Sequence, residues 1–249
     1  MAGHSKWASI KHKKKAVDAK RGVLFTKLTR AITVAARDGG DPEGNPALAL
    51  AVQKARDASM PKDNIERAIA KGTGADSDAA SFEEVLYEGY GPGGVAILVE
   101  ALTDNRNRTG SEVRHTFTKH GGSLGEPGSV AWTFEKKGEI VVDGSRYSED
   151  ELLAAIDAGA EDVVADGDVW EIVTAPTEVA AVRDALAGEG VEIESVELVQ
   201  RPTTRTPVEE DRVATLMRLI EALEDSDDVQ AVHANFDVDS DLLERVATG

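Results

Sequence analysis

The first candidate functional residues of this chain lie at its N-terminus, in the stretch MAGHSKWASIKHKKKAVDAKRG. Lysines recur there with no acidic residue before Asp18, and a tryptophan stands among them. Lysine ammonium groups attract phosphates, and an indole ring offers a face on which an unpaired base can stack. The alternative for the tryptophan is that its ring folds back onto the helices that follow. The stretch predicts a nucleic-acid-binding arm with the candidate residues His4, Lys6, Trp7, Lys11, His12, Lys13, Lys14 and Lys15.

Further cations lie on predicted helices, opposite the apolar side of each helix. A solvated helix face is the alternative for every such stripe, because exposed helix faces commonly carry charge. A second patch surrounds a helix in TDNRNRTGSEVRHTFTKH, where the helix N-terminus could also hold a phosphate. The first set is Lys20, Arg21, Lys27, Arg30, Arg67 and Lys71, and the second patch is Arg106, Arg108, Arg114 and Lys119.

Two motifs resemble cofactor or metal sites, but the residues around them do not fit such sites. GYGPGG matches a dinucleotide-binding fingerprint at Gly89, Gly91 and Gly94, but the strand-like VAILVEAL follows where a helix is required. DVDSD near the end lacks the glycine and glutamate of a calcium loop, and we expect a helix cap there. The histidines show no metal-ligand spacing, and there are no cysteines. We expect no catalytic residue, cofactor or metal.

Charge is distributed unevenly along the chain of 249 residues, whose net charge is -18. Residues 1–72 carry 15 Lys and Arg against 7 Asp and Glu, whereas residues 73–249 carry 13 against 39. Screening over about 8 Å lets a phosphate at the basic part respond mainly to that part. The longest aliphatic run is interrupted by Glu100, and no secretory signal is evident. We expect a cytoplasmic protein without a membrane span.

Hydrophobic periodicity predicts an N-terminal domain of a basic arm and three helices in residues 1–72. The first helix covers 16–38, and Asn45 with Pro46 begins the second, which runs to about residue 58. A third helix follows SMPKDN. GTGADSDAAS is a linker by composition, after which strand-like patterns begin. A strand, a turn, a strand, a helix over 107–120 and a strand SVAWTF are expected next.

Residues 137–200 read as a βαββαβ unit, the order of a ferredoxin-like domain, and hold 17 acidic and 3 basic residues. A helix over 208–223 and a strand in VQAVHANFDV then supply elements that the short second domain lacks. We predict an α+β fold in which the acidic third domain, 137–200, is inserted into a second domain formed by 82–136 plus 201–249. The acidic domain is a poor surface for nucleic acid and favours solubility or a protein contact.

Several long motifs resemble the YebC/PmpR family. They are the N-terminal stretch, GNPALALAVQKARDASMPKDNIERAIAKG, YEGYGPGGVAILVEALTDNRNRT and GGSLGEPGSVAWTFEKKG. The resemblance covers essentially the whole chain and implies three domains, one helical and two α/β. It also implies a DNA-binding transcriptional regulator, although mitochondrial relatives are translational activators and some bacterial members resemble ribosome-associated factors that assist stalled elongation.

The leading hypothesis is a non-enzymatic regulator of gene expression that binds DNA or ribosomal RNA. An enzyme would need a metal or phosphate motif, and a protein-binding adaptor would use the acidic domain. SMPKDN resembles a helix-turn-helix joint, which favours DNA. A stacking aromatic in the arm favours RNA or the ribosome, because unpaired bases are displayed mainly in structured RNA. Both targets stay open at this point.

Overall fold

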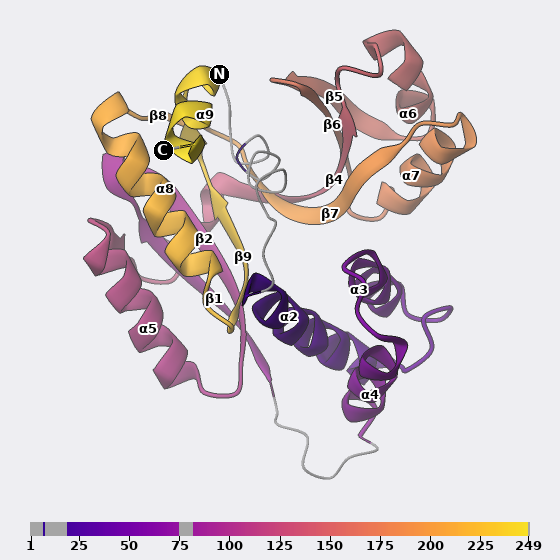
Figure 1. Cartoon of the computed structure of the whole chain (residues 1–249), viewed down its shortest axis with the longest axis horizontal. Coiled ribbons are helices and arrows are strands. Elements are labelled where there is room, and N and C mark those ends of the chain that lie inside the picture. Colours follow the sequence, from indigo (N-terminus) through magenta and orange to yellow (C-terminus); the bar gives the residue numbers. More distant parts are fainter. Residues whose placement is uncertain (1–6, 8–18, 75–81, 249) are drawn as a thin grey trace.

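The computed structural model describes Trp7 and residues 19–74 and 82–248, and these residues form an N-terminal helical part followed by two sheet-containing parts (Figure 1). The α+β class predicted from the sequence is confirmed. No helix of the described residues is both long and apolar enough to cross a bilayer.

The helical part consists of α2 (Ala19–Ala35), α3 (Pro46–Asp57) and α4 (Lys62–Gly72), and a short 3-10 helix prolongs α2. Asn45 caps α3, since its side chain accepts a hydrogen bond from the backbone N–H of Leu48 at 3.1 Å. Apolar side chains such as Ile32, Leu48 and Ile65 pack together between the helices. The small core fixes α2, so that the polar face of α2 is directed away from α3 and α4.

The first sheet has the order β3-β1-β2-β9 and is built from distant parts of the chain. Its strands are β1 (Glu83–Tyr90), β2 (Ala96–Thr103), β3 (Ser123–Leu124) and β9 (Val229–Ala234). Helices α5 (Arg106–Lys119) and α8 (Glu210–Glu224) lie together beside the sheet (Figure 1). Alternate strand residues such as Ile97 and Val99 join the helices in the largest apolar core.

The turn between β1 and β2 explains the glycines of GYGPGG. Gly93 and Gly94 have φ angles of 81° and 76°, which favour glycine. A Cβ on Gly89 would lie 2.7 Å from the ring of Phe117, so the helix packs directly on this backbone. The strand predicted after Gly94 is confirmed, so β2 stands where a dinucleotide-binding fingerprint requires a helix.

The second sheet has the order β5-β6-β4-β7 with every neighbouring pair antiparallel. This is the strand order of a split βαβ unit, as predicted. The sheet comprises β4 (Phe134–Asp143), β5 (Ala160–Asp166), β6 (Val169–Thr174) and β7 (Ile193–Pro202), with α6 (Leu153–Asp157) and α7 (Val179–Gly188) against it.

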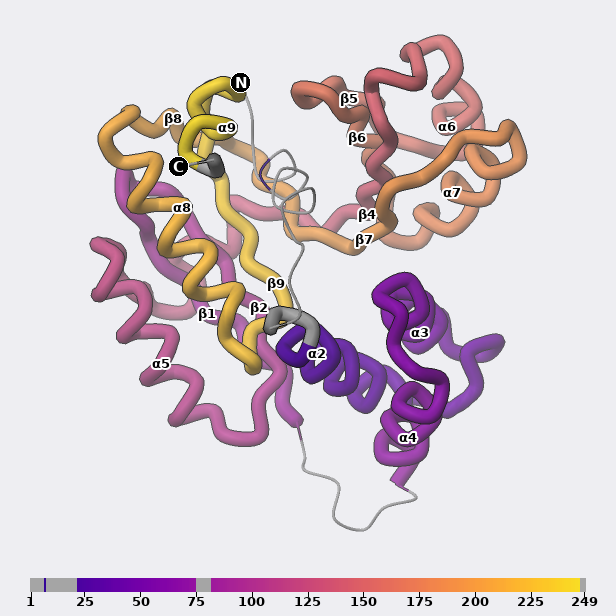
Figure 2. The backbone as a smooth tube through the Cα atoms, viewed as in Figure 1, coloured from indigo at the N-terminus to yellow at the C-terminus, as the bar shows by residue number. Residues whose placement is uncertain are grey.

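After β7 the chain returns to the first sheet through α8 and β9, as the orange and yellow tube in Figure 2 shows. The inserted arrangement predicted from the sequence is therefore present. Two short strands, β8 (Thr206–Pro207) and β10 (Phe236–Asp237), pair with each other, and α9 (Ser240–Thr248) ends the chain. Asp239 caps α9, in agreement with the cap expected in DVDSD.

One predicted strand is wrong. SVAWTF forms a 3-10 helix at Ala131–Thr133, and only its last residue, Phe134, enters β4. The backbone N–H groups of Val130 and Ala131 donate to the carboxylate of Glu88, both at 2.7 Å. Because these donors point at a side chain, they are not available to a strand ladder.

Candidate nucleic-acid interface

Most of the predicted arm lies outside the described residues, namely His4, Lys6, Lys11, His12, Lys13, Lys14 and Lys15. Lys20 and Arg21 are in the first turn of α2, but the structure does not describe their side chains. Trp7 is described, and it corrects the prediction. Its side chain is only 3% exposed and belongs to the core between the first sheet and its helices. An indole in that core has no free face for a base, and burial of its large apolar area explains the position.

Lys27 and Arg30 on α2 also differ from their predicted role. The ammonium of Lys27 donates to the backbone carbonyl of Glu224 at the end of α8, where a cation complements the helix dipole. The guanidinium of Arg30 donates to the carbonyl of Asp227 and lies 2.6 Å from a carboxylate oxygen of Asp228. The polar face of α2 therefore docks onto the turn between α8 and β9 instead of remaining free for phosphate.

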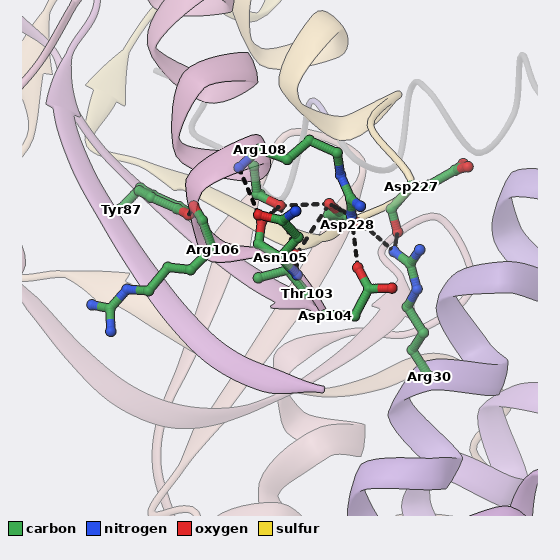
Figure 3. A network of polar contacts seen from close by, with 10 residues as sticks. Arg30, Tyr87, Thr103, Asp104, Asn105, Arg106, Arg108, Asp227 and Asp228 are labelled. Carbon is green, nitrogen blue, oxygen red and sulfur yellow. Dashed lines mark hydrogen bonds and ion pairs between the residues drawn. The ribbon is translucent and has the colours of Figure 1, made fainter. Parts of the chain in front are cut away.

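Asp228 is the centre of this docking network (Figure 3). It is buried, and its second carboxylate oxygen accepts hydrogen bonds from Arg108 at 2.8 Å and from the hydroxyl of Thr109 at 2.5 Å. Burial alone would raise the pKa of Asp228, but the hydrogen bonds from Arg108 and Thr109 and the charge of Arg30 hold it below its ordinary value. The same bond raises the pKa of Arg108. Arg108 is thus a structural residue that joins α5 to the turn before β9.

Lys71 and Arg67 on α4 lie in different surroundings. The ammonium of Lys71 stands 5.6 Å from the centre of the Phe82 ring, and the guanidinium of Arg30 stands 5.4 Å from the same centre. Both distances allow a cation–π interaction, which connects the helical part to the start of β1. Arg67 is exposed, and its guanidinium donates to Asn64 on its own helix at 2.7 Å. Arg67 therefore contacts only its own helix among the described residues and is open to a phosphate.

Arg106 and Arg114 lie about two turns apart on α5. Both line a shallow hollow of about 310 Å³ beside α5, together with Tyr87 and Ser111. In Figure 3 the side chain of Arg106 points away from Asp228, on the opposite side from Arg108. Among the described residues neither Arg106 nor Arg114 forms an ion pair with a carboxylate. Two guanidinium groups in an open hollow can bind an anion such as a phosphate.

The hydroxyl of Tyr87 donates to the backbone carbonyl of Arg106 at 3.2 Å. Burial raises the pKa of Tyr87, and the nearby charge of Arg106 partly offsets this rise. The phenol of Tyr87 is therefore neutral at pH 7, so it would not repel a phosphate bound in the hollow. Asn105 caps the start of α5 by accepting from the N–H of Arg108 at 3.1 Å, which fixes the turn that carries Arg106.

Lys119 lies at the other end of α5, in a second group of cations. Burial lowers the pKa of His120, and the charges of Lys119, Arg218 and His115 lower it further. Arg218 comes from α8, is exposed, and was not found from the sequence. Its position on the same surface as α5 depends on helix packing, and no local signal in the sequence could have indicated it.

A larger hollow of about 610 Å³ lies around the Asp228 network, but most of the charged residues in its lining are acidic. Asp104, Glu112, Asp225 and Asp227 line it together with Arg30 and Arg108. A phosphate would meet net negative charge there. Within residues 19–74 and 82–248, no cluster of three or more His, Asp or Glu side chains is arranged to hold a metal ion.

Comparisons with known proteins cover the whole chain. The family model for the TACO1/YebC protein N-terminal domain matches residues 5–75, and that for the TACO1/YebC second and third domain matches residues 82–236. A probable transcriptional regulatory protein of Rubrobacter xylanophilus is 57% identical over 249 residues, covering 99% of this chain and 100% of the relative. A protein of the same description from Acidothermus cellulolyticus is 54% identical over 248 residues, with 99% and 100% covered.

A solved structure is also similar. The crystal structure of the conserved hypothetical protein Aq1575 from Aquifex aeolicus has a TM-score of 0.82 and 50% sequence identity to this chain. The match covers 90% of this chain and 93% of that one.

Proposed function

The chain belongs to the TACO1/YebC family, and we propose that it is a non-enzymatic regulator of gene expression that acts in the cytoplasm by binding nucleic acid. Its similar relatives are named probable transcriptional regulatory proteins, which supports a regulatory role without catalysis. The main observation that supports a nucleic-acid-binding site is the hollow beside α5. Arg106 and Arg114 lie there without carboxylate partners among the described residues.

The chemistry of this hollow suits a phosphate of the nucleic-acid backbone. A guanidinium donates two parallel hydrogen bonds to a phosphate, so the two arginines can contact two phosphates of one backbone. Asn107 and Ser111 add an amide and a hydroxyl to the same lining. Contacts of this kind position a protein on the backbone but carry no sequence information. The hollow therefore supplies affinity, and target choice comes from elsewhere in the protein.

The names of the relatives favour DNA as the target. The alternative is ribosomal RNA, in a translation factor that assists stalled elongation, and α4 supports this alternative. As the second helix after a helix-turn-helix joint, α4 would have to read bases in the major groove. Its exposed surface carries Asp63 and a pair between Lys62 and Glu66 at 3.4 Å, so acidic groups face the position of the DNA. RNA recognition by shape and backbone does not require such a reading helix.

The experiment that tests the hollow is a salt titration of binding with the double variant Arg106→Ala/Arg114→Ala. If both guanidiniums contact phosphates, the slope of log K against log salt falls by about two, equally for duplex DNA and structured RNA. The control is Arg146→Ala/Arg183→Ala, which removes the same charge from the acidic part of the chain, where both arginines already pair with carboxylates. An unchanged slope in the α5 variant would exclude the hollow as a phosphate site.

The choice between targets needs a second measurement at physiological salt. A DNA-binding regulator protects a defined promoter segment from nuclease and stays at the top of a sucrose gradient of cell lysate. A ribosome-binding factor travels in part with ribosomal particles, and the Arg106→Ala/Arg114→Ala variant loses this association. The two outcomes exclude each other as the main activity of the protein.

A further inference from the structure

Trp132 is the most exposed large apolar side chain of the described residues, with 74% of its surface open to solvent. It lies in the 3-10 helix Ala131–Thr133, between the two sheets in the sequence. Its indole N–H donates to the backbone carbonyl of Ser129 at 3.1 Å. The one polar group of the ring is therefore satisfied within its own loop, and what remains exposed is the aromatic surface.

A second aromatic side chain forms a hydrogen bond with the same carbonyl oxygen of Ser129. The hydroxyl of Tyr90, on β1, also donates to the carbonyl of Ser129, at 3.0 Å. Tyr90 is 40% exposed, so its ring is open to solvent as well. Two donors that converge on one oxygen place the indole and the phenol side by side. Together they form an aromatic platform, which we define as Tyr90 and Trp132.

Glu88 binds the backbone of the loop that carries Trp132. This buried carboxylate accepts hydrogen bonds from the backbone N–H groups of Gly128 at 2.6 Å and of Val130 and Ala131 at 2.7 Å. Burial alone would raise the pKa of Glu88, but these backbone donors outweigh it and keep the pKa below its ordinary value. The carboxylate is therefore charged at neutral pH, and the loop that carries Trp132 is fixed before any partner arrives.

The segment that contacts the 3-10 helix carries a cation. The backbone N–H of Thr203 donates to the carbonyl of Thr133, the residue after Trp132, at 2.8 Å. This bond holds the connection between β7 and β8 beside the 3-10 helix. Arg205 follows two residues later and is exposed, and no ion pair of the described residues involves it. Exposed aromatic rings together with basic side chains are the usual combination in sites for single-stranded nucleic acid.

We propose that the platform of Tyr90 and Trp132 stacks an unpaired base of the bound nucleic acid, while Arg205 contacts an adjacent phosphate. This inference rests on the proposed function and assigns to it a contact with unpaired bases. A base fits because its π-face needs no donor or acceptor from a ring whose N–H is already bonded. A stable protein interface buries about 800 Å² per partner, far more than the exposed parts of two rings provide. The small platform therefore favours a base over a protein surface.

The test compares the full-length protein with Trp132→Ala and Trp132→Phe, using an unstructured RNA of about 12 nucleotides and a DNA duplex of equal length as probes. Stacking predicts that Trp132→Ala lowers affinity for the single strand by about 5- to 150-fold. Affinity for the duplex changes less than about twofold, and Trp132→Phe keeps most of the single-strand affinity. Binding of the single strand also quenches tryptophan fluorescence in the wild type, and this quenching disappears in Trp132→Phe.

Leu153→Ala is the matched control, because Leu153 is 52% exposed and lies on α6 in the acidic part. It should leave both affinities unchanged, and none of the variants should shift the unfolding midpoint, since the altered side chains are solvent-exposed. Unchanged single-strand binding in Trp132→Ala would overturn the platform while leaving the proposed function intact. Equal losses on both probes would also overturn it. Absence of binding by the wild type to either probe would refute the proposed function itself.

Discussion

Replacement of Asp228 by asparagine should loosen the contact between α2 and the first sheet. The side chain keeps its size but loses the charge that faces Arg30 at 2.6 Å and Arg108 at 2.8 Å. Charge-assisted hydrogen bonds contribute about 1.5 to 3 kcal/mol each, and removal of one partner from a buried pair costs about 3 to 5 kcal/mol. The bond to Arg108 counts for less, because that side chain is 42% exposed and solvent screens it. We expect a loss of about 3 kcal/mol.

The assay is hydrogen exchange of the backbone amides of α2 and β9, which reports local opening of these elements. The midpoint of global unfolding would instead average over all parts of the chain. Asp227→Asn is the control, because Asp227 is exposed and uses its backbone carbonyl, which the substitution retains, to accept from Arg30. Exchange in α2 and β9 should accelerate in Asp228→Asn and not in Asp227→Asn. Equal exchange in the two variants would refute the view that Asp228 holds the helical part in place.

The same variant should change the pH dependence of stability. The pKa of Asp228 in the folded protein lies below its ordinary value, so the charged form stabilises the fold above the unfolded pKa of about 3.9. This contribution is lost as pH falls through the lower, folded pKa. The wild type should therefore lose protection of α2 below about pH 4, and Asp228→Asn should lack this part of the pH dependence.

Two further predictions concern the core and the helices. Trp7→Ala should lower the free energy of unfolding by about 3 to 5 kcal/mol in urea titrations, because the indole is buried in the core; an unchanged midpoint would mean that the ring is available to a base. Gly22→Ala should stabilise α2 by about 0.5 to 1 kcal/mol, since a Cβ there meets nothing within 4 Å. Gly72→Ala should destabilise the protein by about 1 to 3 kcal/mol in the same titrations, since its Cβ would lie 2.3 Å from a backbone carbonyl oxygen of α2. Equal effects of Gly22→Ala and Gly72→Ala would contradict this packing.

The local elements of this fold could be predicted from the sequence because their signals are local. Asn45 followed by proline begins α3, and Asp239 begins α9, each through a side-chain cap three residues or fewer from its partner. Short runs rich in β-branched residues, such as EIVVD in β4 and VWEIVT in β6, indicate strands of the second sheet. Their order in the chain then restricts the sheet to a few arrangements, one of which is the observed split βαβ.

The errors arise where a long-range partner decides the structure. SVAWTF alternates like a strand, but Glu88, more than 40 residues earlier in the chain, binds its backbone N–H groups and turns it into a short helix. Lys27 and Arg30 were correctly placed on the polar face of α2, yet periodicity does not tell what that face contacts. Trp7 stands among lysines in the sequence, and only the tertiary fold shows that a core accepts its ring.

The motif NRNR at the start of α5 shows how one residue type serves two purposes within a single helical turn. Arg106 and Arg108 are two residues apart, which places their side chains about 200° apart around the helix axis. Arg108 consequently reaches Asp228, whereas Arg106 faces the hollow with Arg114. Loss of Arg108 should therefore reduce binding only through the fold, together with protection of α2 from exchange. Loss of Arg106 should reduce binding at unchanged protection, so the ratio of the two readouts separates the structural arginine from the phosphate-binding one.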